Sequence, residues 1–155
     1  MKNSSFCVFI ITHGRPNNVI TFDTLKKQNY TGKTYMVIDN TDLCYKEYYD
    51  KFGDSSVIMF DKHEIAKTTD NGDNFNNLRT TTHARNACFN IASGLGVKYF
   101  LVLDDDYTAF DFRLFLDKPI VQPVKNLDLL FDNMLDYFKK INDEMFDKKT
   151  GKISF

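Results

Sequence analysis

Tryptophan is absent from the 155 residues, and cysteine, proline and glycine are scarce, with three, three and seven residues. The low cysteine count is the most informative, because Cys7, Cys44 and Cys88 are far apart and odd in number. This spacing excludes a dense disulfide framework and offers no zinc-binding pair. We therefore expect the protein to reside in a reducing compartment, the cytoplasm.

A strong net charge and long apolar runs are also missing. The 20 Lys and Arg residues nearly balance the 21 Asp and Glu residues, which leaves a net charge of -1. This balance excludes a global basic field for nucleic acid or acidic lipid, so such a partner would need a local patch. The N-terminal apolar run, residues 6–11, is too short for a membrane span or a signal-peptide core. We predict a buried strand there and no membrane association.

Short apolar runs alternate with helical segments along the chain. Hydrophobic residues make up 43% of the sequence, which is enough to form a core. The alternation predicts an α/β fold with a mostly parallel central sheet and flanking helices. Strands are predicted at residues 6–11, 34–38, 57–60, 97–103 and 112–116, and helices at residues 16–28, 42–52, 81–95 and 126–142.

Three segments support more detailed predictions. Residues 97–103 are the most continuously apolar run, so we expect them at the centre of the sheet. The polar segment 68–77 is rich in turn-forming residues and is predicted to be a mobile loop that closes over a ligand. Apolar residues at helical spacing between positions 131 and 141 predict a helix face that packs in the core.

An acidic run, Asp104, Asp105 and Asp106, follows directly after the predicted strand 97–103. Three adjacent carboxylates repel one another, and a divalent cation such as Mg2+ or Mn2+ would relieve that repulsion. A nucleoside diphosphate would benefit from the same ion, because a metal can bridge its phosphates. Open α/β sheets bind ligands beyond the carboxyl ends of their strands, where this run lies. The residues alone leave a second interpretation open, a solvated acidic turn.

Arginine is rare in this lysine-rich chain, with four residues among the 20 basic ones. Three of them, Arg15, Arg79 and Arg85, lie near the predicted carboxyl edge of the sheet. The planar guanidinium group suits phosphate and carboxylate recognition better than an ammonium group does. Salt bridges on helix surfaces are the alternative for each arginine alone.

Two further polar residues are predicted at the same edge. Asp39 ends the second predicted strand, and His13 lies in the turn after the first. A carboxylate at position 39 can accept hydrogen bonds from a base or a ribose, and His13 can contact a nucleotide. A helix-capping role for Asp39 is equally compatible with the sequence.

The motif THGRP follows the first predicted strand, the second strand ends in Asp, and the helix ARNACFNIA precedes YFLVLDDD. This order resembles the glycosyltransferases of the GT-A fold, in which a DxD motif follows a central strand. Longer segments are similar to the TET-associated glycosyltransferases of bacteriophages. These segments span most of residues 6–110 and are THGRPNNVITFDTLKKQNYTGKTYMVIDN, KTTDNGDNFNN and ARNACFNIASGLGVKYFLVLDDDYTAF.

The resemblance implies a Rossmann-like GT-A nucleotide-sugar-binding fold and a role for each matching acidic residue. Asp106 is implied as the direct ligand of Mn2+ or Mg2+. Asp104 is implied to contact the ribose or sugar side of the donor and to contribute to the metal site. Asp105 is placed among the donor-binding residues.

The resemblance also implies which other residues bind the donor. It implies that Thr12 and Arg15 embrace the nucleotide, that Asp39 contacts the base, and that Arg85 and Asn86 meet the donor. His13 and Arg79, which the residues themselves indicate, complete the predicted site.

By the same resemblance, the activity is metal-dependent transfer of a sugar from a nucleotide sugar, with a UDP-sugar favoured. The implied acceptor is a hydroxymethylated pyrimidine such as 5-hydroxymethylcytosine in phage DNA, within the host cytoplasm. We expect residues 1–155 to form one GT-A-like domain that provides the donor-binding half.

The catalytic base stays unassigned at this stage. In the GT-A fold the acceptor site usually follows the DxD strand, and no His lies beyond Asp106 in this sequence. Truncation at the C-terminus, and therefore activity of this chain alone, stays open. The alternatives are a non-catalytic nucleotide-binding module, a subunit of a split enzyme, and a nucleotidyltransferase.

Overall fold

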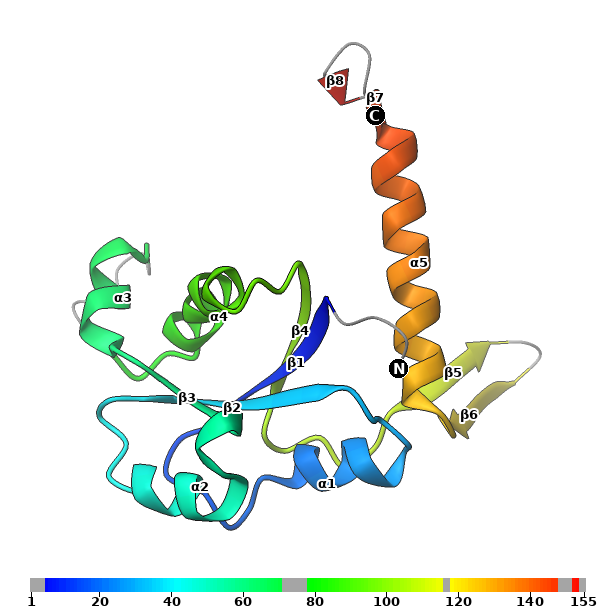
Figure 1. Ribbon diagram of the computed structural model, residues 1–155. Helices are drawn as coiled ribbons and strands as arrows, with labels where there is room; N and C mark the ends of the chain where they lie inside the picture. The colour runs from blue at the N-terminus through cyan, green and yellow to red at the C-terminus, as the bar shows by residue number, and fades with distance from the viewer. Residues whose placement is uncertain (1–4, 71–77, 116–117, 148–151, 154–155) are drawn as a thin grey trace.

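The computed structural model describes residues 5–70, 78–115, 118–147 and 152–153. Its main sheet has four strands, all parallel, in the order β3-β2-β1-β4 (Figure 1). These strands are β1 (Phe6–Ile11), β2 (Lys33–Asp39), β3 (Val57–Phe60) and β4 (Tyr99–Asp104). They are connected by α1 (Ile20–Lys27), α2 (Tyr45–Phe52), the 3-10 helix η1 (Asp54–Ser56), α3 (Lys62–Thr68) and α4 (Thr82–Gly94). The parallel sheet with flanking helices confirms the predicted α/β, Rossmann-like fold.

Strand β1 lies at the centre of the hydrophobic core, and all six of its residues are buried. Its even-numbered residues pack with α1, α2 and the C-terminal helix α5 (Leu127–Met145). Its odd-numbered residues pack on the opposite face with α3 and α4. Because helices cover both faces, the strand is apolar at every position, as strands of buried parallel sheets are.

The expectation that the fourth strand is central was wrong. Among the described strands, β4 pairs only with β1 and lies at the edge of the sheet. Its apolar character has another cause, because Tyr99 and Leu101 pack on one face while Phe100 and Val102 pack on the other. A continuous run of apolar residues therefore indicates that both faces of the strand are covered, and it does not indicate how many strands lie beside it.

The first helix begins later than the sequence predicted. We expected it to begin at Pro16, but α1 begins at Ile20. The N–H of Asn18 donates to the carbonyl of Arg15 at 2.9 Å, which places Pro16 second in a tight turn. Proline is favoured at that turn position as well as in the first turn of a helix.

Helix α3 was not predicted, because its seven residues contain only one large apolar side chain, Ile65. Asp61 caps it, since its carboxylate accepts the N–H groups of His63 and Glu64. Thr68, the first residue of the loop predicted at 68–77, ends this helix. Residues 71–77 lie outside the described part of the chain.

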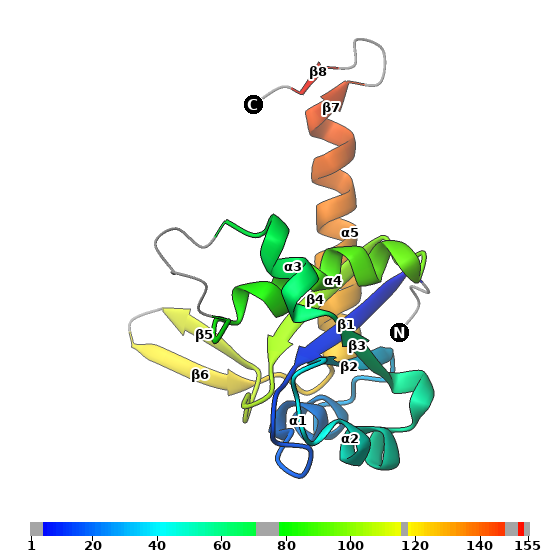
Figure 2. The same ribbon diagram turned by 90° about the vertical axis from the view of Figure 1, so that its left-hand side faces the viewer.

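A hairpin and a long helix follow the acidic run. Strands β5 (Asp111–Phe115) and β6 (Pro119–Pro123) pair antiparallel, and β6 was missed because a proline stands at each of its ends. Helix α5 extends away from the sheet in both views, and the short strands β7 (Phe146–Asp147) and β8 (Lys152–Ile153) follow it (Figures 1 and 2). Leu135 is buried but Phe138 is 56% exposed, so only the first part of the predicted α5 face packs in the core.

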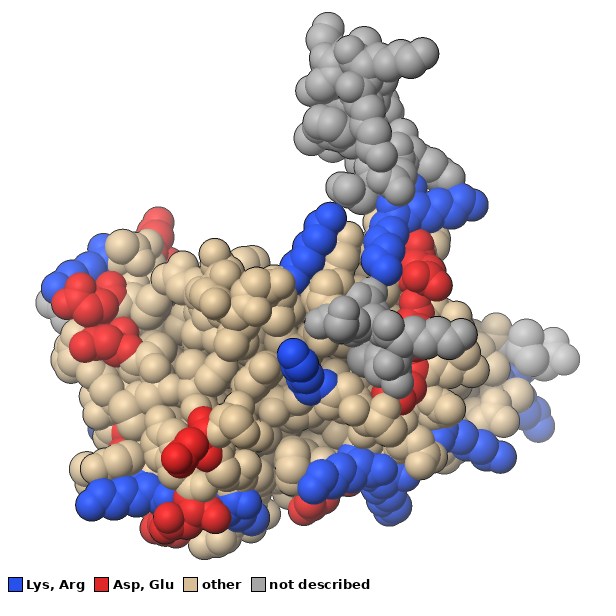
Figure 3. All heavy atoms as spheres, viewed as in Figure 1, with Lys and Arg blue, Asp and Glu red and all other residues tan. Residues whose placement is uncertain are grey.

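The described surface agrees with the near-zero net charge. On the face that Figure 3 shows, basic and acidic side chains are interspersed, and neither sign forms a continuous field. Within the described residues, no helix is long and apolar enough to cross a membrane.

Candidate functional site

The carboxyl ends of the four parallel strands border a cleft of about 690 Å³. Such ends lie at one edge of a parallel sheet, so residues distant in the sequence meet there. Because the strand order is β3-β2-β1-β4, the residues after β2 and β3 form one end of the cleft. The residues after β4 form the other end, and the turn after β1 lies between them.

At the β4 end of the cleft, Asp104 pairs with Arg85 of α4. The Nη2 group of Arg85 donates to both carboxylate oxygens of Asp104, at 2.7 and 2.9 Å. Both side chains are partly exposed to the cleft. The described contacts use only this one nitrogen of the guanidinium group, so its other N–H groups can donate to a ligand.

Asp105 has a different environment from its neighbours, because its carboxylate is buried and both of its oxygens have a partner. One oxygen accepts the hydroxyl of Thr12 at 2.7 Å, and the other lies 2.9 Å from the guanidinium group of Arg15. Thr12 Oγ1 also lies 2.9 Å from the hydroxyl of Tyr48, which accepts the backbone N–H of Arg15 at 2.9 Å. Since the single proton of Thr12 goes to Asp105, the hydroxyl of Tyr48 must donate to Thr12.

These contacts close a ring of hydrogen bonds that joins the turn after β1, helix α2 and the end of β4. Burial and the charges of Asp42 and Asp105 raise the pKa of Tyr48 although the hydrogen bonds with Thr12 and Arg15 lower it, so the phenol keeps the proton that it donates. The ring fixes the backbone of Arg15 and one side of its guanidinium group. The Arg15 side chain is still 53% exposed and lines the cleft.

Thr21 of helix α1 holds the backbone of the acidic run through hydrogen bonds. The Thr21 hydroxyl donates to the carbonyl of Asp104 at 2.6 Å and accepts the N–H of Tyr107 at 2.8 Å, and its backbone N–H donates to the carbonyl of Asp105. Thr21 thus bridges the residues on either side of Asp106. The carboxylate of Asp106 lines the cleft, is exposed, and makes no hydrogen bond or ion pair within the described residues.

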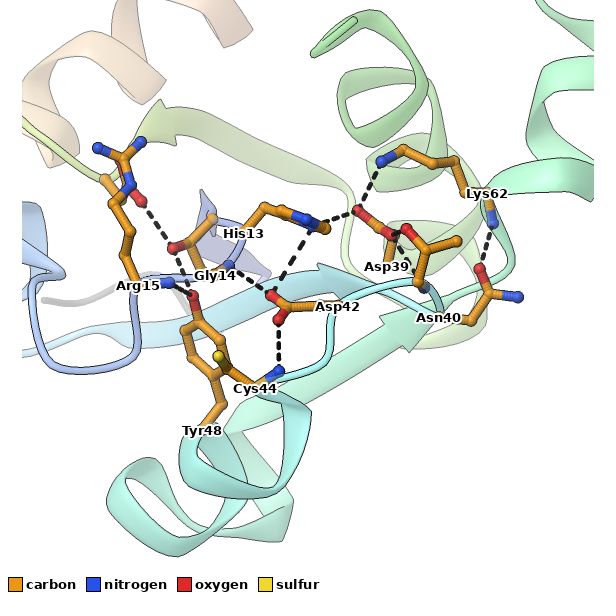
Figure 4. A network of polar contacts seen from close by, with 12 residues as sticks. His13, Gly14, Arg15, Asp39, Asn40, Asp42, Cys44, Tyr48 and Lys62 are labelled. Atoms are coloured by element: carbon orange, nitrogen blue, oxygen red, sulfur yellow. Dashed lines mark hydrogen bonds and ion pairs between the residues drawn. The ribbon is translucent and has the colours of Figure 1, made fainter. Parts of the chain in front are cut away.

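At the opposite end of the cleft, Asp39 is the centre of a second network (Figure 4). One of its oxygens accepts the N–H and hydroxyl of Thr41, and the other accepts Lys62 Nζ at 2.9 Å and contacts His13 Nδ1 at 3.0 Å. Burial alone would raise the pKa of Asp39, but the hydrogen bonds from Thr41 and Lys62 hold it below its ordinary value. Asp39 is therefore a carboxylate at neutral pH.

The turn between the two networks is shaped by Gly14 and Asp42. Gly14 has a φ of 69°, a left-handed conformation that glycine adopts without strain. Its N–H donates to the buried carboxylate of Asp42 at 2.7 Å, which also accepts the N–H of Cys44 at 2.8 Å. This arrangement holds His13 and Arg15, on either side of the glycine, at the cleft (Figure 4).

Nine of the ten residues predicted for the site line this one cleft: Thr12, His13, Arg15, Asp39, Arg79, Arg85, Asp104, Asp105 and Asp106. The tenth, Asn86, does not line it, and its side-chain amide donates to Thr69 at 3.0 Å.

The sequence interpretation missed Lys62 and Tyr48. Lys62 comes two residues after β3. Ligands bind at the carboxyl ends of strands, but the sequence analysis predicted no site residue after the third strand. Tyr48 is fully buried in α2 and looks in the sequence like an ordinary core residue of an amphipathic helix.

A family model described as "TET-Associated Glycosyltransferase" matches residues 6–149 of the chain. Comparisons with curated proteins and with solved structures gave no match.

Proposed function

Since the chain belongs to the TET-associated glycosyltransferase family, we propose that the cleft at the carboxyl edge of the sheet binds a nucleotide-sugar donor in a metal-dependent reaction. The family is one of glycosyltransferases, and a glycosyltransferase requires a sugar donor. The metal, the position of the donor and the acceptor are the parts that we propose.

The observation that carries the proposal is the division of the cleft into two chemically different ends. Asp39, Lys62 and the apolar side chain of Phe60 lie at the β2–β3 end, and they suit a flat polar base. Arg15 and Arg85 lie towards β4, with the acidic run, and they suit a diphosphate with its metal ion. A nucleoside diphosphate sugar has these two parts joined by a ribose.

The described residues fit a divalent ion that is shared with the donor. They contain no group of three or more His, Cys, Asp or Glu side chains that could hold a metal alone. Mg2+ and similar ions are typically held by one or two carboxylates together with substrate phosphates and water. Asp106 would supply the first carboxylate because it has no described partner, and Asp104 would supply the second. Such an ion would stabilise the negative charge of the departing diphosphate.

The side chains of the chain itself contribute orientation and further charge. In glycosyl transfer the oxygen of the acceptor hydroxyl forms a bond to the anomeric carbon and loses its proton, while the bond from that carbon to the phosphate oxygen breaks and the nucleoside diphosphate leaves. Negative charge then grows on the diphosphate, and preorganised guanidinium groups stabilise it. The hydrogen-bonded ring at Asp105 fixes Arg15 before the ligand arrives, so this group does not have to be ordered during the reaction.

For the acceptor we propose a hydroxymethylated pyrimidine of phage DNA, with the free hydroxyl of that base as the attacking group. The similarity of residues 6–110 to phage enzymes of this family supports this choice. The interspersed surface charges on the face in Figure 3 indicate that a DNA strand would be held by local contacts and not by a broad basic surface.

Calorimetric titration with sugar nucleotides tests the donor site. We expect UDP-sugars to bind in the presence of Mn2+ or Mg2+ and to lose most of their affinity in EDTA. Nucleoside triphosphates serve as the comparison, because preferential binding of a triphosphate would indicate a nucleotidyltransferase. Incubation with 5-hydroxymethylcytosine DNA, followed by digestion and mass spectrometry of the nucleosides, tests transfer itself.

A further inference from the structure

Tyr107 follows directly after the acidic run, and its aromatic side chain is 40% exposed. It is not among the residues that line the donor cleft, although its neighbour Asp106 is. Its hydroxyl makes no hydrogen bond with the described residues, so the contacts that hold this side chain are those of its backbone and its ring. Tyr107 therefore places an aromatic surface just outside the cleft, beside the proposed metal ligand.

The backbone of Tyr107 is fixed relative to the acidic run. Its N–H donates to the hydroxyl of Thr21 at 2.8 Å, and the same hydroxyl donates to the carbonyl of Asp104 at 2.6 Å. A single side chain of α1 thus holds both ends of the turn that carries Asp106, and Figure 1 shows this turn passing beside α1. The position of Tyr107 next to the cleft is therefore set before any ligand binds.

The ring of Tyr107 is also supported, because it stacks on Phe110. The two ring centroids lie 5.8 Å apart, with an angle of 16° between the planes. Phe110 is anchored in turn, since its N–H donates to the side chain of Gln28 at 2.8 Å and its carbonyl accepts the amide of Gln28 at 2.8 Å and the N–H of Val124 at 2.9 Å. On its other side the ring of Phe110 meets Phe131 of the core edge to face. The Tyr107 ring is therefore a preformed platform and not a free side chain.

We propose that Tyr107 is the platform on which the pyrimidine of the acceptor stacks, with the hydroxyl group of that base directed at the cleft. The inference rests on the proposed function, since it assigns a residue to the acceptor side of that site. Because Tyr107 lies outside the donor cleft, the ligand that it meets is the one that approaches the sugar from outside. A base that stacks on Tyr107 extends the existing pair with Phe110 by a third ring, and little conformational freedom is lost because the platform is already ordered.

Stacking on Tyr107 requires that the target base has left the DNA helix. Within a duplex the neighbouring bases cover both faces of each base, so an aromatic side chain can stack only on a base that is unpaired or extruded. Extrusion costs the free energy of pairing and stacking in the duplex, whereas a single strand does not incur this cost. We therefore expect single-stranded DNA to bind more tightly than the same sequence as a duplex.

The first experiment uses the unmodified protein and two fluorescently labelled single-stranded oligonucleotides. One contains a single 5-hydroxymethylcytosine, and the other has an abasic site at the same position. Their dissociation constants are measured by fluorescence anisotropy with UDP and Mn2+ present. The strand with the base should bind about tenfold more tightly, in line with the contribution of one base stacked on an aromatic side chain. Equal affinities would overturn the proposal.

Substitutions then test the residue itself. Tyr107→Leu keeps an apolar side chain but removes the ring, so the affinity for the 5-hydroxymethylcytosine strand should fall about tenfold while that for the abasic strand stays the same. Tyr107→Phe keeps the ring and should bind both strands as the unmodified protein does. Tyr45→Leu is the matched control, because Tyr45 is 39% exposed, lies in α2 and does not line the cleft.

The other outcomes each exclude a different part of the argument. Equal losses for the two strands in Tyr107→Leu would mean that the residue does not contact the base, and a loss in Tyr107→Phe as large as in Tyr107→Leu would mean that the hydroxyl and not the ring is used. Weaker binding of UDP by Tyr107→Leu would move the residue to the donor side. Each of these results would overturn the platform.

Failure of the proposed function would be visible separately. If the unmodified protein binds no DNA that contains 5-hydroxymethylcytosine, the proposed acceptor falls and the platform with it. Calorimetric titration of the same protein with UDP and Mn2+ shows independently whether the donor site stands. Melting curves of each variant identify any loss that is due to unfolding.

Discussion

Asp105 and Asp106 are neighbours in the sequence, yet replacing each by asparagine should have opposite consequences. Asp105→Asn keeps the size of a buried side chain but removes the charge that binds Thr12 and Arg15. Asp106→Asn changes an exposed carboxylate that has no described partner. We therefore expect Asp105→Asn to lower stability and Asp106→Asn to abolish metal-dependent nucleotide binding without lowering stability.

The size of the first effect follows from the contacts of Asp105. A hydrogen bond to a charged group contributes about 1.5–3 kcal/mol, and breaking a fully buried ion pair costs about 3–5 kcal/mol. The Arg15 side chain is 53% exposed, so solvent screens its share, and the buried bond from Thr12 dominates. The expected loss is about 2 kcal/mol, which lowers the melting temperature by roughly 4–8 °C for a chain of this length.

The two substitutions are compared in one pair of assays. Scanning calorimetry without ligand should show the lower melting temperature for Asp105→Asn and a change of at most about 2 °C for Asp106→Asn. Titration with UDP and Mn2+ should show loss of binding by Asp106→Asn. Equal losses of stability would mean that the division of roles between the two carboxylates is wrong. Normal binding of UDP and Mn2+ by Asp106→Asn would remove that residue from the metal site.

Three further predictions concern the pair of Arg85 with Asp104 and the two hydrogen-bond networks. Arg85→Lys should weaken donor binding roughly tenfold in calorimetric titration although the charge is kept, because an ammonium group cannot contact Asp104 and a phosphate through separate nitrogens. Equal affinity of the two proteins would mean that Arg85 contributes only its positive charge. Tyr48→Phe should lower the free energy of unfolding, measured in urea, by about 1–3 kcal/mol, since the N–H of Arg15 loses its partner. An unchanged free energy of unfolding would mean that the ring of hydrogen bonds does not stabilise the fold. The lowered pKa of Asp39 means that its carboxylate contributes stability above the ordinary carboxyl pKa of about 3.9 and loses it as the pH falls through the folded value. The stability gap between the unmodified protein and Asp39→Asn should therefore be wide at pH 7 and should shrink progressively as the pH falls below about 4. A gap independent of pH would contradict this cause.

Much of the fold could be predicted because buried parallel strands leave a direct trace in the sequence. The run at 6–11 gave the bounds of β1, and Gly53 and Gly96 correctly marked the ends of helices, both with positive φ. The position of β4 could not be predicted, because covered faces make an edge strand as apolar as a central one. Helix α3 could not be predicted, because the cap at Asp61 and packing stabilise it and its sequence has no periodic apolar pattern.

The cleft could be predicted in outline because strand ends meet at one edge of a parallel sheet. From that rule, the sequence alone predicted that Arg15, Asp39 and the acidic run lie at the same edge of the sheet. It could not predict Lys62 or Tyr48, because neither their residue type nor their spacing is unusual. Their importance comes from partners 23 and 36 positions away in the sequence, Asp39 and Thr12, and such pairs appear only once the chain is folded.

The three adjacent acidic residues have different environments because β4 ends at the first of them. Successive side chains of a strand point to opposite sides, and Asp104 is the last residue of β4. Asp104, Asp105 and Asp106 all line the cleft, but only the Asp105 carboxylate is also held in the buried ring with Thr12 and Tyr48. Asp105 and Asp106 form a turn after the strand, in which the carboxylate of the first is buried and that of the second is exposed. The intervening position is free to take a structural role, and in this chain an aspartate there orients Arg15 towards the same cleft.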